Sequence, residues 1–137
     1  MKKSKGFTLV ELIIVIVIVG ILSIVAVPIY RGYTKKAIAT EAKALLGSIA
    51  TAQRVYYAEF GNYYEISSSV TFNTTLDIDA RSNKYFDSYK VTTAGAANSY
   101  TFTSIVEGRI GSAAEGISVT MQAVEGGSII TIATGLD

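Results

Sequence analysis

The feature that most constrains this chain is an apolar run of 19 residues, Leu12–Tyr30, which contains no Asp, Glu, Lys or Arg. As an α-helix the run would be about 28 Å long, close to the roughly 30 Å hydrocarbon core of a bilayer. Basic residues stand on both sides of it, namely Lys2, Lys3, Lys5, Arg31, Lys35 and Lys36. The simplest interpretation is a single membrane span with its basic N-terminus in the cytoplasm.

One carboxylate, Glu11, stands at the N-terminal edge of this run. A charge costs about 2.5–3.5 kcal/mol at the centre of a membrane helix and less near its end. Either a partner offsets that cost or the side chain reaches water in the headgroup region. The sequence therefore raises the question of what Glu11 binds.

A cleaved secretory signal would look different from this N-terminus. It would have a shorter apolar region followed by a small-residue cleavage site. Here the run is longer, and an amphipathic helical pattern continues beyond it. We therefore interpret the run as a retained segment.

The composition of the 137-residue chain suits one domain plus an anchor. Cysteine and histidine are both absent, which excludes disulfides and removes the commonest acid–base residue and metal ligand. The formal net charge of +1 gives no support to nucleic-acid binding. Without residues 1–6 the chain would keep nine basic and eleven acidic side chains.

A second helical pattern follows Pro28, in which apolar residues recur at alternating spacings of four and three: Ile38, Ala42, Leu45, Ile49, Ala52 and Tyr56. Such a stripe predicts an amphipathic helix, and Lys36, Lys43 and Arg54 fall away from it. The helix should end near Phe60-Gly61-Asn62, where Gly and Asn tolerate left-handed backbone angles. A helix over residues 7–60 would span about 80 Å.

The remainder of the chain predicts a small antiparallel sheet. Residues 61–84 are typical of a loop with short irregular elements. Four runs then have strand character: 85–93, 100–107, 117–124 and 128–134. Alternation places one set of residues on a common face in the second run and another in the third: Tyr100, Phe102, Ser104 and Val106, and Ile117, Val119, Met121 and Ala123. Residues 125–128 suit a hairpin turn, and Gly95, Gly108 and Gly111 mark the other joins. The expected fold class is α+β, a long N-terminal helix packed on an antiparallel sheet of three or four strands.

The predicted head carries no catalytic constellation, so we expect a protein that is not an enzyme and that uses no cofactor. Asp77 and Asp79 place two carboxylates close together, but a solvated loop explains them better than a metal site. The few basic residues of the head give no particular support to DNA binding. The final strands, with Ile129, Ile130 and Ile132, should be held by hydrogen bonds and apolar contacts.

The segment Gly6-Phe7-Thr8-Leu9-Val10-Glu11, after its short basic leader, closely resembles the prepilin cleavage motif of type IV pilins and the related pseudopilins. The resemblance continues through the aliphatic run with Gly20 and Pro28, and it covers roughly residues 1–60. It implies that Gly6 ends a leader that a prepilin peptidase removes, and that Phe7 becomes an N-methylated N-terminus. It also implies that Glu11 meets the amino group of a neighbouring subunit during assembly.

Two poor helix formers, Gly20 and Pro28, lie within the predicted long helix. Relative to Ala, Gly20 weakens a helix by about 1 kcal/mol and Pro28 by about 3 kcal/mol. Pro28 also removes a backbone hydrogen bond and favours a kink. The resemblance implies that the interval between them unwinds locally in filaments, and an ordinary kinked span is the alternative.

The resemblance predicts a structural subunit that polymerises into a type IV pilus. Its segments would be a leader (1–6), a transmembrane and filament-core helix (7–30), an amphipathic helix (31–61) and a globular head (62–137). Before assembly the subunit would lie in a bacterial inner membrane, N-terminus cytoplasmic, and after assembly in an extracellular filament. Its partners would be further copies of itself, the prepilin peptidase and the pilus assembly machinery.

Three alternatives stay open at the level of sequence. The chain could be a pseudopilin of a type II secretion system, a minor pilin, or a monomeric membrane-anchored binding domain. Residues 52–64 and 83–86 are more similar to pilins than to pseudopilins, which favours a pilin of a type IV pilus over these alternatives. The sequence does not distinguish adhesion, twitching motility or secretion as the role of the filament.

Overall fold

The computed structural model describes residues 6–93, 101–123 and 129–136. The chain divides into two compact units, Met1–Thr34 and Lys35–Asp137. Several expectations lie outside the described residues: the lysines at 2, 3 and 5, Tyr100, Gly95 and the hairpin turn at 125–128. One helix, α1, spans Leu9–Phe60 and contributes to both units. Its length confirms the long helix predicted from the sequence.

The first unit is helical from Leu9 onward, and α1 is continuous through Gly20 and Pro28. Hydroxyl side chains donate to backbone carbonyls one turn earlier, as Ser23 Oγ does to Val19 at 2.7 Å. In this unit the side chains of residues 6–31 are all exposed. The first unit therefore has no core of its own.

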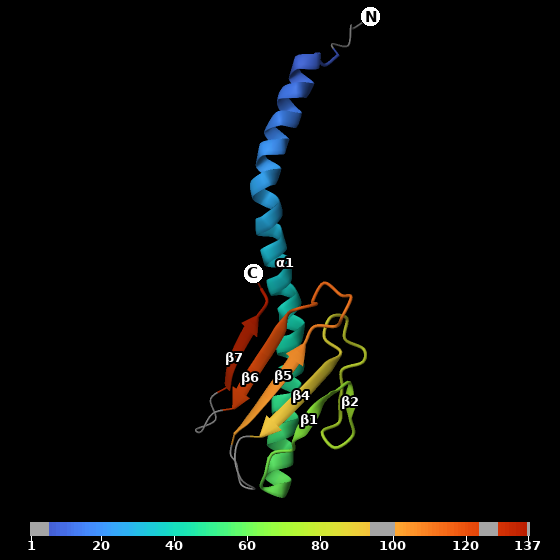
Figure 1. The fold of residues 1–137 in the computed structure, drawn as a ribbon, viewed down its shortest axis with the longest axis vertical. Helices are drawn as coiled ribbons and strands as arrows, with labels where there is room; N and C mark the ends of the chain where they lie inside the picture. The colour runs from blue at the N-terminus through green and yellow to red at the C-terminus, as the bar shows by residue number, and fades with distance from the viewer. Residues whose placement is uncertain (1–5, 94–100, 124–128, 137) are drawn as a thin grey trace, which may run out of the picture. The chain divides into compact units, whose positions relative to one another are not determined.

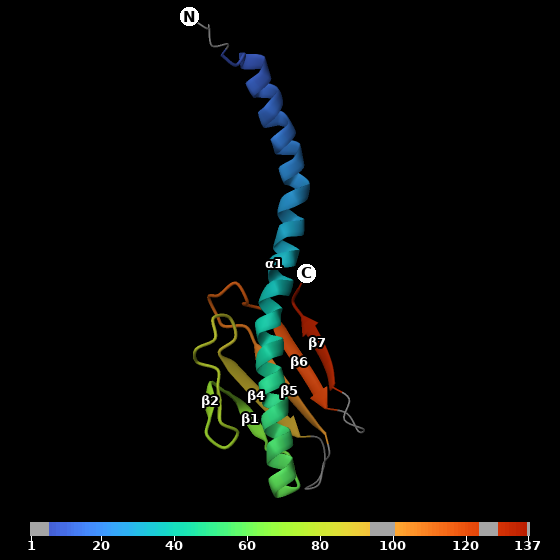
Figure 2. The ribbon, with the colours of Figure 1, turned by 180° about the vertical axis from the view of Figure 1, so that it is seen from behind.

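The second unit packs residues 35–60 of α1 onto an antiparallel sheet (Figures 1 and 2). The five strands are ordered β1-β4-β5-β6-β7, with bounds β1 Ile66–Val70, β4 Ser88–Thr93, β5 Phe102–Glu107, β6 Ser118–Ala123 and β7 Ile129–Thr134. A separate two-stranded sheet joins β2 Phe72–Asn73 to β3 Ile78–Asp79. The α+β fold class is thus confirmed.

The predicted number of strands was wrong, because β1 forms a fifth. Its sequence, ISSSV, lacks the apolar alternation that marks a strand, and only Ile66 is buried. The strand forms because its backbone pairs with the edge of β4, with Ile66 opposite Val91 and Val70 opposite Tyr89. Serine contributes little to that pairing beyond its backbone, so the sequence pattern gave no signal.

The core lies between α1 and one face of the sheet. The predicted stripe is confirmed: Ile38, Ala42, Leu45 and Ile49 are buried, and Ala52 and Tyr56 are partly buried against the core. The predicted faces of β5 and β6 are also confirmed within the described residues, since Phe102, Ser104, Val106, Val119 and Met121 are buried. In β4, Tyr89 and Val91 are buried as well. The buried stripe of the helix and the buried faces of the strands therefore form one apolar layer.

The joins between elements follow the glycines. At the end of α1, Gly61 has a φ of 73°, and its N–H donates to the Tyr57 carbonyl at 2.8 Å. Between β5 and β6, the N–H of Gly108 donates to Ile117 at 2.9 Å. A Cβ at Gly108 would lie 1.8 Å from the carbonyl oxygen of Ala114, so a side chain there would displace the loop.

The last strand is held in the sheet by backbone pairing with β6. β7 pairs with β6 along its whole length, from Ile129 opposite Ala123 to Thr134 opposite Ser118. The side chain of Ile132 is 51% exposed, so it does not fasten the strand by burial as expected, and the side chains of Ile129 and Ile130 lie outside the described residues. Ala133 of the same strand is partly buried against the core. Ile132 lies opposite Thr120, which is not one of the buried positions of β6.

Candidate functional site

The candidate site is the segment that leads into α1. Gly6, Phe7 and Thr8 precede the helix and are exposed, with Phe7 at 82%. The peptide bond between Gly6 and Phe7 therefore lies outside the first helical turn. An enzyme can reach that bond without unwinding α1.

Glycine at position 6 is not required by the folded chain. A Cβ placed on Gly6 meets no atom of the described residues within 4 Å. The backbone there is not in the left-handed region, so conformation does not demand glycine either. A requirement for glycine at this position would have to come from another molecule.

Glu11 closes a capping box with Thr8 at the start of α1. The Thr8 backbone N–H donates to Glu11 Oε2 at 2.8 Å, and the Thr8 hydroxyl donates to the same oxygen at 2.9 Å. In return, the Glu11 N–H donates to Thr8 Oγ1 at 3.2 Å. This reciprocal arrangement satisfies donors that a helix N-terminus otherwise leaves free. The first role of Glu11 is therefore to begin its own helix.

The cap leaves part of the carboxylate available. Oε2 accepts both hydrogen bonds from Thr8, whereas Oε1 makes no hydrogen bond or ion pair within the described part of the chain. Breaking the bond between Gly6 and Phe7 would leave the Thr8 amide intact, so the cap does not depend on residues 1–6. A carboxylate held this way can accept a further charge-assisted hydrogen bond from an external cation.

Gly20 and Pro28 lie farther along the same helix and do not join Gly6, Phe7 and Glu11. Gly20 lies nine positions after Glu11, a rise of about 13.5 Å along the helix. A Cβ on Gly20 meets nothing within 4 Å. Pro28 has no N–H to donate to the carbonyl of Ile24, so one hydrogen bond of the helical ladder is missing there. The helix is nevertheless unbroken in the single chain.

The surface of α1 between these residues is apolar. Each large apolar side chain from Leu12 to Tyr30 is between 48% and 75% exposed. Within the described residues α1 is long and apolar enough to cross a membrane, with a mean hydropathy of 3.3 over its most apolar 18 residues. An apolar surface of this extent needs an apolar partner, either lipid or protein.

Asp77 and Asp79, the two carboxylates considered from the sequence as a metal site, have separate environments. Asp79 accepts two hydrogen bonds from the Arg81 guanidinium, at 2.9 and 2.6 Å, and one from the Arg81 backbone. These hydrogen bonds lower the pKa of Asp79 to about 2. Asp77 is exposed, and the described residues hold no group of three or more side chains suited to a metal.

Three polar contacts that sequence reasoning missed position these elements. Thr8-Leu9-Val10-Glu11 has the spacing of a capping box, a signal that was available. Gln53 lies fully buried on the apolar stripe, where its amide donates to the Tyr64 carbonyl at 2.7 Å and accepts from the Tyr64 N–H at 2.9 Å. Glu41 accepts from the N–H groups of Tyr85 and Phe86. No local pattern could identify the last two partners.

Comparison with known proteins locates the same segment. Residues 1–27 match the family described as "Prokaryotic N-terminal methylation motif". This match contains Gly6, Phe7, Glu11 and Gly20, the residues selected from the sequence, but ends before Pro28.

Similar proteins are fimbrial proteins and pilins. The chain is 41% identical over 88 residues to a "Fimbrial protein" of Neisseria meningitidis serogroup A, covering 64% of this chain and 50% of the relative. It is 33% identical over 92 residues to the "Type IV major pilin protein PilA" of Myxococcus xanthus, covering 67% and 39%. With "Fimbrial protein EcpC" of Eikenella corrodens it shares 35% identity over 100 residues, covering 73% and 62%.

The chain thus spans about half the length of the curated relatives it matches. The similarity and the motif nevertheless agree with each other and with a long apolar helix followed by an antiparallel sheet. The resemblance predicted from residues 6–11 is therefore confirmed: the chain carries the N-terminal methylation motif of type IV prepilins and is similar to type IV pilins.

Proposed function

We propose that this chain is a pilin, a non-enzymatic structural subunit that polymerises into a type IV pilus. The observation that carries the proposal is the coincidence of the methylation motif with an apolar helix that the chain leaves exposed along residues 12–30. A filament core would bury that helix against the same segment of neighbouring copies. The similarity to proteins named type IV major pilins supports the same function.

Processing would begin at the exposed bond between Gly6 and Phe7. In our proposal a prepilin peptidase removes residues 1–6 on the cytoplasmic side of the bacterial inner membrane, and Phe7 is then N-methylated. The open space around Gly6 supports a requirement set by the peptidase rather than by the fold. Substituting Gly6→Val should therefore leave the head folded while the uncut precursor accumulates.

Assembly would use the charge of Glu11. In the apolar core its carboxylate would meet the amino group of a neighbouring copy's Phe7, and the two charges would offset each other's desolvation. The second carboxylate oxygen, Oε1, is available for this contact while Thr8 holds Oε2. Only a neighbouring copy whose Phe7 amine lies level with Glu11 can form this ion pair. The pair would therefore set the axial register between the two subunits.

The interval from Gly20 to Pro28 would unwind in the assembled filament. The missing hydrogen bond at Pro28 and the weak helix former at Gly20 lower the cost of that change. The helix is continuous in the single chain, so unwinding would accompany assembly. Extraction of the subunit from the membrane by the assembly machinery is the step at which we expect it.

The test is the mass of the intact subunit in filaments sheared from native cells. The proposal predicts one dominant species that starts at methylated Phe7. A processed species found only in membranes would instead indicate a pseudopilin of a type II secretion system or a minor pilin. An uncut chain starting at Met1 would overturn the proposal in favour of a plain membrane-anchored domain.

A further inference from the structure

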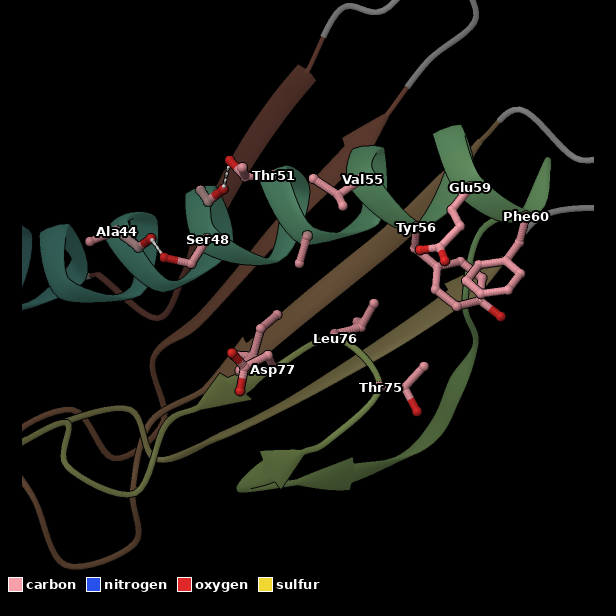
Figure 3. A pocket seen from close by; sticks show the side chains of 13 residues that line it. Ala44, Ser48, Thr51, Val55, Tyr56, Glu59, Phe60, Thr75, Leu76 and Asp77 are labelled. Carbon is pink, nitrogen blue, oxygen red and sulfur yellow. Dashed lines mark hydrogen bonds between the residues drawn. The ribbon is translucent and has the colours of Figure 1, made fainter.

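One face of α1 in the second unit borders an open groove of about 850 Å³ (Figure 3). Residues 75–78 form its opposite wall, and α1 lines it between residues 44 and 60, among others with Ala44, Gly47, Ser48 and Ala52. Most of the helical lining consists of small side chains, which is why space remains beside the helix. The groove lies entirely within residues 35–137.

The end of the groove is aromatic and partly apolar. Tyr56 contacts Phe60 and Tyr64, with ring centroids 4.4 and 5.3 Å apart. Val55 is 64% exposed and Phe60 is 58% exposed. Covering these apolar side chains with another molecule would lower the free energy, because it removes apolar surface from water.

The groove carries negative charge on both walls. Glu59 extends from the helix, and Asp77 stands on the opposite wall (Figure 3). Both side chains are exposed. The ion pairs among the described residues involve Asp79 and Asp87, and neither Glu59 nor Asp77 takes part in one. A positively charged surface would complement this groove.

Such a surface exists on another side of the same helix. Lys36, Lys43 and Arg54 are exposed, and their spacings of 7 and 11 residues place them within about 20° of one another around the helix axis. We call these three residues the basic ridge. The described residues contain no ion pair that involves them. Arg54 and Glu59 are about 140° apart on the helix, so the ridge and the acidic wall face different directions.

We propose that the groove of one copy receives the basic ridge of a second copy in the filament. This inference rests on the proposed polymerisation and identifies a contact between heads that it would use. The two surfaces differ, so each copy can engage one neighbour through its groove and another through its ridge. Contacts of this heterologous kind continue into open helical assemblies. The charges set the register, and Val55 and Phe60 add apolar burial.

Charge reversal tests the contact in cells that assemble the full chain. The ridge variant carries Lys43→Glu and Arg54→Glu, and the groove variant carries Glu59→Lys and Asp77→Lys. Each should lower the yield of sheared filaments by at least about tenfold, because like charges then face each other. The processed subunit should still accumulate in membranes, since all four side chains are exposed and processing uses residues 6 and 7.

Co-expression of the two variants gives the sharper readout. The ridge variant presents net negative charge on both surfaces, because its two new glutamates outnumber Lys36, and the groove variant presents basic groups on both. Alternating copies would restore opposite charges at every contact, so mixed filaments should form when neither variant assembles alone. This result also shows that both variants fold.

The matched control reverses two other cations of the head, Lys84→Glu with Lys90→Glu, and should assemble as the wild type does. Equal loss in this control would assign the effect to net charge and overturn the proposal. Normal filaments from either single-surface variant, or no recovery on co-expression, would also overturn it and leave the groove to a different occupant. Absence of filaments from the wild type would instead refute the proposed function.

Discussion

The two parts of helix α1 make opposite use of apolar residues. From Leu12 to Tyr30 the large apolar side chains are all at least 48% exposed, whereas eight residues from Ile38 to Gln53 are buried against the sheet. The first part is apolar on all sides, and the second has one stripe. A helix that is apolar all round requires partners on every side, which a single small head cannot provide.

This difference separates stability from assembly. Substitutions in the second part should change the free energy of unfolding, because the chain supplies both sides of the contact. Substitutions in the first part should change only what the chain does with lipid or with other copies. The following predictions test that separation, beginning with the largest effect.

Glu11→Gln should abolish filament assembly while leaving the head intact. Glutamine retains the capping-box geometry but removes the charge, and breaking a buried ion pair by neutralising one partner costs about 3–5 kcal/mol. The yield of sheared filaments should fall at least about a hundredfold, with cleavage largely normal by mass. Thr8→Ala is the matched variant, because it removes the cap and keeps the charge. Assembly that tolerates Glu11→Gln but not Thr8→Ala would make capping the role of Glu11.

Ile49→Ala and Ile16→Ala compare the same substitution in the two parts. Ile49 is fully buried and Ile16 is 66% exposed. In detergent-solubilised full chain, Ile49→Ala should lower the free energy of unfolding of the head by about 2–5 kcal/mol. Ile16→Ala should change it by less than about 0.5 kcal/mol. Equal effects in chemical denaturation would contradict the separation of the two parts.

Gln53→Leu should destabilise the head by about 2 kcal/mol, because it leaves the half-buried N–H and C=O of Tyr64 without their partner. Leucine fits the apolar surroundings, so packing alone predicts no loss. Denaturation midpoints measure the difference, with the exposed Ala58→Leu as control. An unchanged midpoint would mean that water replaces both hydrogen bonds.

Ser104→Ala should stabilise the head slightly, by up to about 1 kcal/mol. Ser104 is fully buried between α1 and the sheet, and its hydroxyl has no hydrogen-bond partner in the described chain. Removing an unsatisfied buried hydroxyl recovers part of its desolvation cost. A lower melting temperature than that of the wild type would indicate a partner for this hydroxyl.

The smallest effect concerns the exposed pair of Asp79 and Arg81. The pKa of Asp79 is lowered to about 2 in the folded chain, so its contribution to stability is present above pH 4. The contribution is lost as the pH falls through 2. The wild type should therefore lose slightly more stability than Asp79→Asn in melting curves taken between pH 5 and pH 2. The difference should be small because surface pairs contribute little, and parallel curves would exclude a role for the pair.

Much of the fold followed from periodicity. The stripe from Ile38 to Tyr56 and the alternation in β5 and β6 identified their buried faces, because each element repeats its own contact environment. Gly61 marked the end of the helix for the same local reason. β1 was missed because a serine strand is defined by the neighbour it pairs with.

In the candidate site, too, the local features could be predicted from the sequence. Gly6, Phe7 and Glu11 form one short segment, so their relation was visible in the sequence and matches the methylation motif. The capping box of Thr8 and Glu11 was also local, and its spacing could have been found. The roles of Gly20 and Pro28 stay predictions, because they concern an assembled state.

The sequence by itself determined the helix, its apolar and amphipathic parts, the main strands and the motif at the N-terminus, since these depend on residues near one another along the chain. Only the tertiary structure decided that Gln53 holds Tyr64, that Glu41 holds the N–H groups of Tyr85 and Phe86, and that an acidic groove lies beside α1. Gln53 and Glu41 lie 11 to 45 residues from their hydrogen-bond partners along the chain. Periodicity reports which side of an element is buried, whereas folding alone decides what it is buried against.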